Sequence, residues 1–148
     1  MQNIRIPPPI VAVIAVIGVY ITSLFNAFTF TLPWWISLLL FVLGVVIAFL
    51  AMGQFGRSQT TTDPIHPESA STLVTTGIYG YTRNPMYLGL ALFLLAFVLL
   101  FGSWLGVIWF VAFIVYIQLF QIHREEAAMR DLFGDDYVAY CRRVRRWI

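Results

Sequence analysis

The chain has 148 residues, of which 60% are hydrophobic and only 11% are charged, and its formal net charge at pH 7 is +2. Soluble domains carry about 25% charged residues, so this composition, with a mean hydropathy of +0.83, excludes an ordinary water-soluble domain. No charged residue lies between Arg5 and Arg57 or between Arg83 and Arg124, and the sequence therefore predicts one compact helical membrane domain over residues 1–148.

The first uncharged stretch is long enough for two spans of about 20 residues. One is predicted over residues 10–28, after three prolines whose missing N–H groups cost little at a helix start. The second is predicted over residues 34–52, where Trp34 and Trp35 suit an interfacial belt. No small-residue cleavage site precedes the next charge, so the first span is expected to be retained and not cleaved as a signal. Together the two spans form an N-terminal part, residues 1–53.

The loop predicted over residues 53–84 is too long for a simple connector. Turn-forming residues at 60–64 and 66–69 predict turns and a helix N-cap, and residues 73–81 are semi-apolar with two glycines. Long ordered loops are usually functional. The loop is therefore expected to line a ligand site, and a loop that floats free is the alternative.

The second uncharged stretch predicts a helical hairpin. Its spans are expected at residues 86–101 and 104–121, and the connection Gly102-Ser103 is so short that they must pack antiparallel. The predicted fold class is all-α integral membrane, with four transmembrane helices, a cytoplasmic loop and C-terminal interfacial helices.

The residues after the fourth span predict the interfacial helices. Gly134 separates two runs of apolar residues at helical spacing: Met129, Leu132 and Phe133, then Tyr137, Tyr140, Cys141, Val144, Trp147 and Ile148. Arginines flank the second run, as in a helix that lies in the headgroup layer. Cys141 is the single cysteine, which excludes an intramolecular disulfide. It is interpreted as a small apolar residue on a helix face, with a reactive or palmitoylated thiol as the alternative.

The arginines predict the orientation in the membrane. All nine basic residues are arginine, and neither of the short connections at residues 26–33 and 101–104 carries a charge. The positive-inside rule then places both termini and the long loop in the cytoplasm. Without an organelle signal, a prokaryotic cytoplasmic membrane is the default expectation.

The hairpin brings polar residues from both of its ends to one membrane depth. Span three begins with Arg83, Asn84 and Tyr87, and span four is followed by Glu125 and Glu126. Carboxylates at the hydrocarbon boundary need a partner, and an ion pair with Arg83 would satisfy them. The functional alternative is a small zwitterionic cofactor, whose ammonium group a glutamate would hold and whose sulfonium would lie against tyrosine faces.

Other ligand classes find no support. There is no GxGxxG or GxxxxGK[ST] motif for nucleotide binding, and no zinc-type spacing of histidines and glutamates. Neither a metal nor a nucleic acid is expected, and the expected partners are the lipid bilayer and a lipophilic acceptor.

Several separated motifs, in order, resemble the isoprenylcysteine carboxyl methyltransferase family. They are TLVTTGIY at residues 72–79, RNPMYLG at residues 83–89 and EExxMxxxFGxxYxxYxxxVxR at residues 125–146. The resemblance implies an integral membrane methyltransferase that uses S-adenosylmethionine, releases S-adenosylhomocysteine and has no Rossmann domain. It also implies that residues 54–148 form the cofactor-binding core.

Carried over by motif, the resemblance implies specific site residues. The expected cofactor-binding residues are Thr72, Leu73, Val74, Tyr79, Asn84, Pro85, Met86, Tyr87 and Glu125. Arg83 and Glu126 are the expected catalytic residues, and Gln121, Arg124 and Arg146 are the expected substrate residues. The family usually has histidine where Asn84 stands here, and Asn84 cannot act as a base. Gln121 occupies the position at which the eukaryotic enzymes carry an arginine for the substrate carboxylate.

The predicted function is transfer of a methyl group from S-adenosylmethionine to a lipophilic acceptor, lipid-like or prenylated, by an enzyme that resembles the isoprenylcysteine carboxyl methyltransferases. Phospholipid N-methylation is the alternative within the enzyme class, and product analysis separates the two. A non-catalytic membrane protein with a structural ion-pair cluster is the alternative from another class. A transporter should carry polar groups mid-span, and these spans have no charged residue there.

Overall fold

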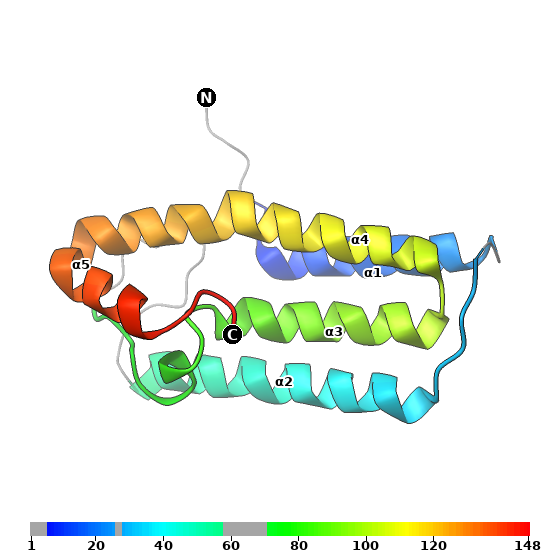
Figure 1. The fold of residues 1–148 in the computed structure, drawn as a ribbon, viewed down its shortest axis with the longest axis horizontal. Helices are drawn as coiled ribbons and strands as arrows, with labels where there is room; N and C mark the ends of the chain where they lie inside the picture. The colour runs from blue at the N-terminus through cyan, green and yellow to red at the C-terminus, as the bar shows by residue number, and fades with distance from the viewer. Residues whose placement is uncertain (1–5, 26–27, 58–70) are drawn as a thin grey trace.

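The regular structure of this chain is helical, in agreement with the predicted all-α class. The computed structural model describes residues 6–25, 28–57 and 71–148, and within them it contains helices and one isolated β-bridge. The elements in chain order are α1 (Pro8–Ser23), α2 (Trp34–Arg57), the 3-10 turn η2 (Gly77–Gly80), α3 (Pro85–Phe101), α4 (Trp104–Tyr116), the π-helical turn η3 (Ile117–Ile122) and α5 (His123–Arg143). The first four α-helices run lengthwise beside one another, and α3 packs against α1, α2 and α4 (Figure 1).

The two uncharged connections meet at one end of the bundle. The Phe30 N–H donates to the Gly102 carbonyl at 2.7 Å, and the Trp104 N–H donates to the Phe28 carbonyl at 3.0 Å. Gly102 has a φ of 60°, a left-handed conformation that ends α3 and that glycine adopts without strain. The predicted antiparallel hairpin of α3 and α4 is therefore confirmed, and the described charged residues after Arg57 lie at the opposite end.

Small residues let the helices approach closely. A Cβ atom added to Gly89 on α3 would lie 2.8 Å from the Gly44 carbonyl oxygen on α2, and one added to Gly44 would lie 2.7 Å from the Gly89 carbonyl oxygen. A Cβ atom on Gly18 of α1 would meet the Trp109 ring on α4 at 2.4 Å. Such backbone proximity is the usual basis of helix packing in membranes.

Replacement of Gly89 by valine should destabilise the bundle. The backbone of α2 cannot move aside as a flexible side chain would, and overpacking of this kind typically costs about 1–3 kcal/mol. The matched control is Gly53→Val in α2, where an added Cβ meets nothing within 4 Å. Thermal unfolding in detergent should show a lower Tm for Gly89→Val than for Gly53→Val, and equal Tm values would contradict the close approach.

The observed helices differ in length from the predicted spans. Trp34–Gln54 and the helical stretch Trp104–Arg143, which is interrupted at Gly134, are each long and apolar enough to cross a membrane, whereas α1 and α3 have 16 and 17 residues. The first predicted span, residues 10–28, ends early at Ser23. Near this end the hydroxyls of Thr22 and Ser23 bond to backbone carbonyls of the preceding turn, and Phe28 has a non-helical φ of 56°.

The loop predicted over residues 53–84 can be compared with the structure only in part, because the structure does not describe residues 58–70. The helix α2 continues to Arg57, so the loop begins later than residue 53, and η2 is its one described helical turn. The turns predicted at residues 60–64 and 66–69 lie outside the described residues, as do Arg5 and Asn26.

The helix after the hairpin does not stop where the fourth span was predicted to end. It passes through η3 directly into α5, and charged residues begin at Arg124. Gly134 then adopts a φ of 48° and a ψ of −122°, which breaks the helix at the predicted point, and the chain doubles back (Figure 1).

The second apolar run is not one free amphipathic helix. The helix ends at Arg143, and Val144 has extended dihedrals, so Trp147 and Ile148 lie outside it. Tyr137, Tyr140 and Val144 are buried together, with residues that include Leu73 and Phe133 packed against them. Tyr137, Tyr140 and Val144 of this run thus face protein, because the reversal at Gly134 turns them toward the segment that precedes η2, while Ile148 is exposed.

Candidate functional site

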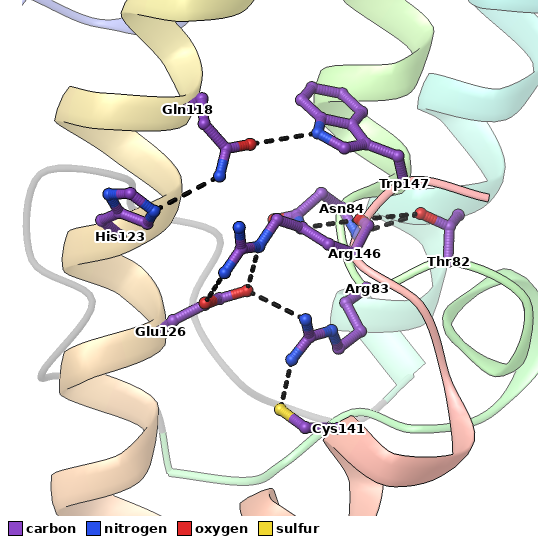
Figure 2. Close-up of polar contacts among 9 residues, drawn as sticks. All are labelled: Thr82, Arg83, Asn84, Gln118, His123, Glu126, Cys141, Arg146 and Trp147. Atoms are coloured by element: carbon purple, nitrogen blue, oxygen red, sulfur yellow. Dashed lines mark hydrogen bonds and ion pairs between the residues drawn. The ribbon is translucent and has the colours of Figure 1, made fainter.

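Three segments meet at the charged end of the bundle. They are the start of α3 with the residues before it, the first turn of α5, and residues 144–148, which we call the tail segment. Figure 2 shows their polar side chains converging on Glu126 and Arg146. The polar residues at the two ends of the hairpin are therefore brought together, as the sequence predicts.

Glu126 is the centre of an ion cluster. It is only 6% exposed and accepts two hydrogen bonds from Arg146, from Nε at 2.8 Å and from Nη2 at 2.7 Å. Arg83 Nη2 lies 3.2 Å from its Oε1, which confirms the predicted pairing of Arg83 with a glutamate. Burial raises the pKa of Glu126, but the Arg146 hydrogen bonds and the two positive charges outweigh it and hold the pKa below its usual value.

The tail segment also binds the entrance of α3 through its backbone. The Arg83 N–H donates to the Arg145 carbonyl at 3.0 Å. The buried Asn84 donates from Nδ2 to the Arg146 carbonyl at 2.9 Å, and the Thr82 hydroxyl lies 3.4 Å from the same oxygen. Asn84, which stands at the family's histidine position, thus has its amide nitrogen bound to protein.

Glu125 points to a different partner from its neighbour. The Tyr87 hydroxyl donates to Glu125 Oε1, which joins the first turn of α3 to the first turn of α5. Burial raises the pKa of Glu125 from 4.5 to about 7, although the Tyr87 hydrogen bond and the Arg124 charge act in the opposite direction. A carboxyl group near half-ionisation therefore lies beside a tyrosine at the end of the apolar part of the bundle.

The segment before α3 forms a second, mostly apolar wall. Val74 and Tyr79 are buried against Ala51 of α2, with Ile78 and Met86 packed beside them. The Tyr140 hydroxyl donates to the Tyr79 carbonyl at 2.7 Å. Burial, together with the neighbouring Tyr140 and the Glu125 charge, raises the pKa of Tyr79, so its ring lies in electrostatic range of the same carboxylate.

Some predicted site residues lie apart from this convergence. Gln121 is 4% exposed and donates from Nε2 to the Ile6 carbonyl at 3.2 Å, so its amide holds the segment before α1. Thr72 and Arg124 are exposed. Leu73 packs on the buried Tyr137 cluster, and Pro85 is the buried first residue of α3.

Comparison with known proteins identifies the family. A sequence model described as phospholipid methyltransferase matches residues 32–136, which is more than half of the chain. The chain belongs to the phospholipid methyltransferase family.

Relatives of this family member support the predicted resemblance. Protein-S-isoprenylcysteine O-methyltransferase B of Arabidopsis thaliana is 31% identical over 114 residues, which are 75% of this chain and 58% of that protein. The protein-S-isoprenylcysteine O-methyltransferase of Schizosaccharomyces pombe is 31% identical over 102 residues, 69% of this chain and 43% of that protein. An uncharacterized protein of Haemophilus influenzae is 50% identical over 66 residues, 43% of this chain and all of that protein. The chain spans about half the length of the named methyltransferases.

Sequence reasoning missed several contacts of this family member. Arg83 Nη1 donates to Cys141 Sγ, which gives the lone cysteine a polar partner. Gln118 accepts from Trp147 Nε1 at 3.1 Å, and its amide nitrogen lies 3.3 Å from His123 Nε2. A glutamine within the apolar run of span four was the available signal for Gln118. No signal pointed to Cys141, because its contact depends on the reversal at Gly134.

Proposed function

We propose that this chain is an integral membrane methyltransferase that transfers a methyl group from S-adenosylmethionine to a lipophilic acceptor. The observation that carries the proposal is the placement of Glu125, a partly buried carboxyl group bound by Tyr87 at the end of the apolar helices. Family membership and the relatives named as methyltransferases support the same reaction.

The donors at the site fit a zwitterionic cofactor. Arg83 Nε is buried and has no hydrogen-bond partner among the described residues, and buried polar groups in native proteins normally have one. A ligand carboxylate would satisfy it, while Glu125 is the acceptor for a ligand ammonium group. The predicted cofactor residues Val74, Tyr79 and Met86 contribute an apolar wall beside these two charges.

The residues of this chain would act mainly by alignment. When bound, the cofactor supplies a methyl group that is already activated on a sulfonium. Alignment of reacting groups can contribute about 7–11 kcal/mol to a barrier. In our proposal Glu125 binds the ammonium group of the cofactor, Arg83 Nε binds its carboxylate, and Tyr87 holds the Glu125 carboxyl in place. The ion pair of Arg83 with Glu126, both predicted as catalytic, also holds the α3 entrance against α5.

The membrane arrangement is part of the proposal. We infer that α1 to α4 all cross the bilayer, with both termini and the charged end of the bundle in the cytoplasm. The arginine distribution supports this orientation. The 50% identity to a Haemophilus influenzae protein favours a prokaryotic cytoplasmic membrane.

Two acceptor classes are consistent with the family. The relatives named as isoprenylcysteine O-methyltransferases favour a prenylcysteine-like carboxylate, and the family description favours a phospholipid amine. Gln121, whose amide is bound to the Ile6 carbonyl, provides no positive charge for a carboxylate. Mass analysis of the methylated product from native lipid extract and from a prenylcysteine analogue separates the two classes.

The decisive experiment is calorimetric binding of S-adenosylmethionine to the detergent-purified chain, with Glu125→Ala alongside. The wild type should bind in the micromolar range, and Glu125→Ala should lose binding because the ligand ammonium loses its acceptor. S-adenosylhomocysteine should compete. A folded wild type that does not bind would overturn the proposed function.

A further inference from the structure

The tail segment, residues 144–148, connects three elements that are far apart in the sequence. Its backbone accepts hydrogen bonds from Arg83 and Asn84 at the entrance of α3. Its side chains bind α5 through Arg146 and η3 through Trp147. The family match ends at residue 136, so this segment lies beyond it.

Arg146 is the residue that makes most of this connection. Its carbonyl accepts from Asn84 at 2.9 Å, while its guanidinium donates to both carboxylate oxygens of Glu126, at 2.8 and 2.7 Å (Figure 2). A planar guanidinium bound at two points fixes direction as well as distance. One residue therefore sets the orientation of the first turn of α5 relative to the α3 entrance.

We propose that Arg146 is a positioning residue for the cofactor site. The inference rests on the proposed function. Glu126 adjoins Glu125 in the first turn of α5, and Asn84, the residue before α3, lies three residues before Tyr87. The link from Asn84 through Arg146 to Glu126 thus runs beside the direct contact of Tyr87 with Glu125. This link therefore keeps the Glu125 carboxyl, the proposed acceptor for the ligand ammonium group, at a fixed position relative to the start of α3.

This role differs from the substrate-binding role that the sequence predicted for Arg146. A residue that binds the acceptor affects the KM for the acceptor and leaves cofactor binding unchanged when no acceptor is present. A positioning residue affects cofactor binding by itself. The bundle should still fold without Arg146, because the ion pair of Arg83 with Glu126 and the Tyr87–Glu125 hydrogen bond remain.

The test is calorimetric binding of S-adenosylmethionine to the full chain in lipid nanodiscs, without acceptor. Arg146→Gln should bind at least tenfold more weakly than the wild type. Arg146→Lys, which keeps the charge but not the two-point geometry, should recover part of the loss. The charge control is Arg143→Gln, an exposed arginine in the last turn of α5, and it should bind within twofold of the wild type.

A stability control separates positioning from general loosening. Val98→Ala removes methyl groups from a fully buried site in α3, away from the charged end, and should lower the Tm without weakening binding. If the two variants lower the Tm by the same amount and also weaken S-adenosylmethionine binding by the same factor, the proposal is overturned. Wild-type affinity in Arg146→Gln would overturn it as well.

Hydrogen exchange followed by mass spectrometry tests the connection without any ligand. In Arg146→Gln the peptide with the Arg83 N–H should exchange faster, because its acceptor lies in the tail segment, while peptides from α1 should not change. If the wild type does not bind S-adenosylmethionine, the proposed function fails and the cofactor role of Arg146 fails with it, while this exchange result still decides whether Arg146 holds the tail segment against the α3 entrance. Unchanged exchange at Arg83 would overturn it.

Discussion

Glu126→Gln should lower the stability of the protein by about 3 kcal/mol, because it leaves two guanidinium groups without their carboxylate. Breaking a buried ion pair typically costs about 3–5 kcal/mol. The lower end is expected here, since the Arg146 side chain is 34% exposed and can turn to water. Arg83 has no such outlet, because its side chain is only 11% exposed. For a chain of this length the loss corresponds to a fall in Tm of about 10 °C.

The difference in stability between the wild type and Glu126→Gln should depend on pH, because the pKa of Glu126 is lowered in the folded protein. The pKa of Glu126 is lower in the folded protein than its ordinary value of 4.5. Its stabilising contribution is therefore present above pH 4.5 and is lost as the pH falls through the folded-state pKa. Thermal unfolding of Glu126→Gln and the wild type should converge in acid. Asp131→Asn, an exposed carboxylate on the same helix, is the matched control, and equal melting of the two variants at neutral pH would refute the role of the cluster.

Cofactor affinity should rise about five- to sixfold between pH 6 and pH 7.5. With a pKa of about 7, the ionised fraction of Glu125 rises from about 0.09 to about 0.76 over this interval, and only the ionised form attracts an ammonium group. The α-amino group of the ligand, with an ordinary pKa of about 7.7–8.0, is still about 0.6–0.8 protonated at pH 7.5, which reduces the rise to about five- to sixfold. Calorimetry at several pH values measures the effect directly.

Two variants assign that pH dependence. Glu125→Gln should bind weakly and without pH dependence. His123→Gln should keep the dependence, because His123 is exposed and points to Gln118. The groups that interact electrostatically with Glu125 are Tyr87, Arg124, Glu126 and Tyr79. A rise of about five- to sixfold that persists in Glu125→Gln would refute the assignment to this carboxyl.

The contribution of Glu125 to the stability of the fold should fall as the pH rises, whereas its contribution to cofactor affinity rises. The unfolded chain loses this proton near pH 4.5, whereas the folded chain keeps it until about pH 7. The contribution is thus fully present below pH 4.5 and is lost as the pH rises through 7. Glu125→Gln should therefore exceed the wild type in stability at pH 8, by roughly 2–3 kcal/mol. The same carboxyl would strengthen cofactor binding and weaken the fold over one pH interval.

The helices and the main site contacts follow from patterns that are local in the sequence. Uncharged stretches of the right length predict α2, α3 and α4, and the short connection at Gly102 requires a hairpin. The hairpin in turn predicts that Arg83 meets a glutamate, and the structure confirms it at Glu126. Each step needs only hydrophobic length and one short turn.

The tail contacts could not be predicted in the same way. The direction of the chain after Gly134 depends on one unusual pair of backbone dihedrals, and nothing in the neighbouring residues specifies them. The contacts of Cys141 with Arg83 and of Arg146 with Glu126 both depend on this reversal. Periodicity alone favoured a lipid-facing helix, because it does not distinguish burial against protein from burial against lipid.

The place of the tail segment in the sequence has a consequence for biosynthesis. Residues 145–147 emerge from the ribosome after every segment that they contact, including the entrance of α3 and the first turn of α5. The contacts among α1, α2, α3 and α4 do not involve the tail segment. The charged end has its full set of contacts only once residues 145–147 are present, so a chain that stops before them would keep the helix contacts and lack the Arg146 link.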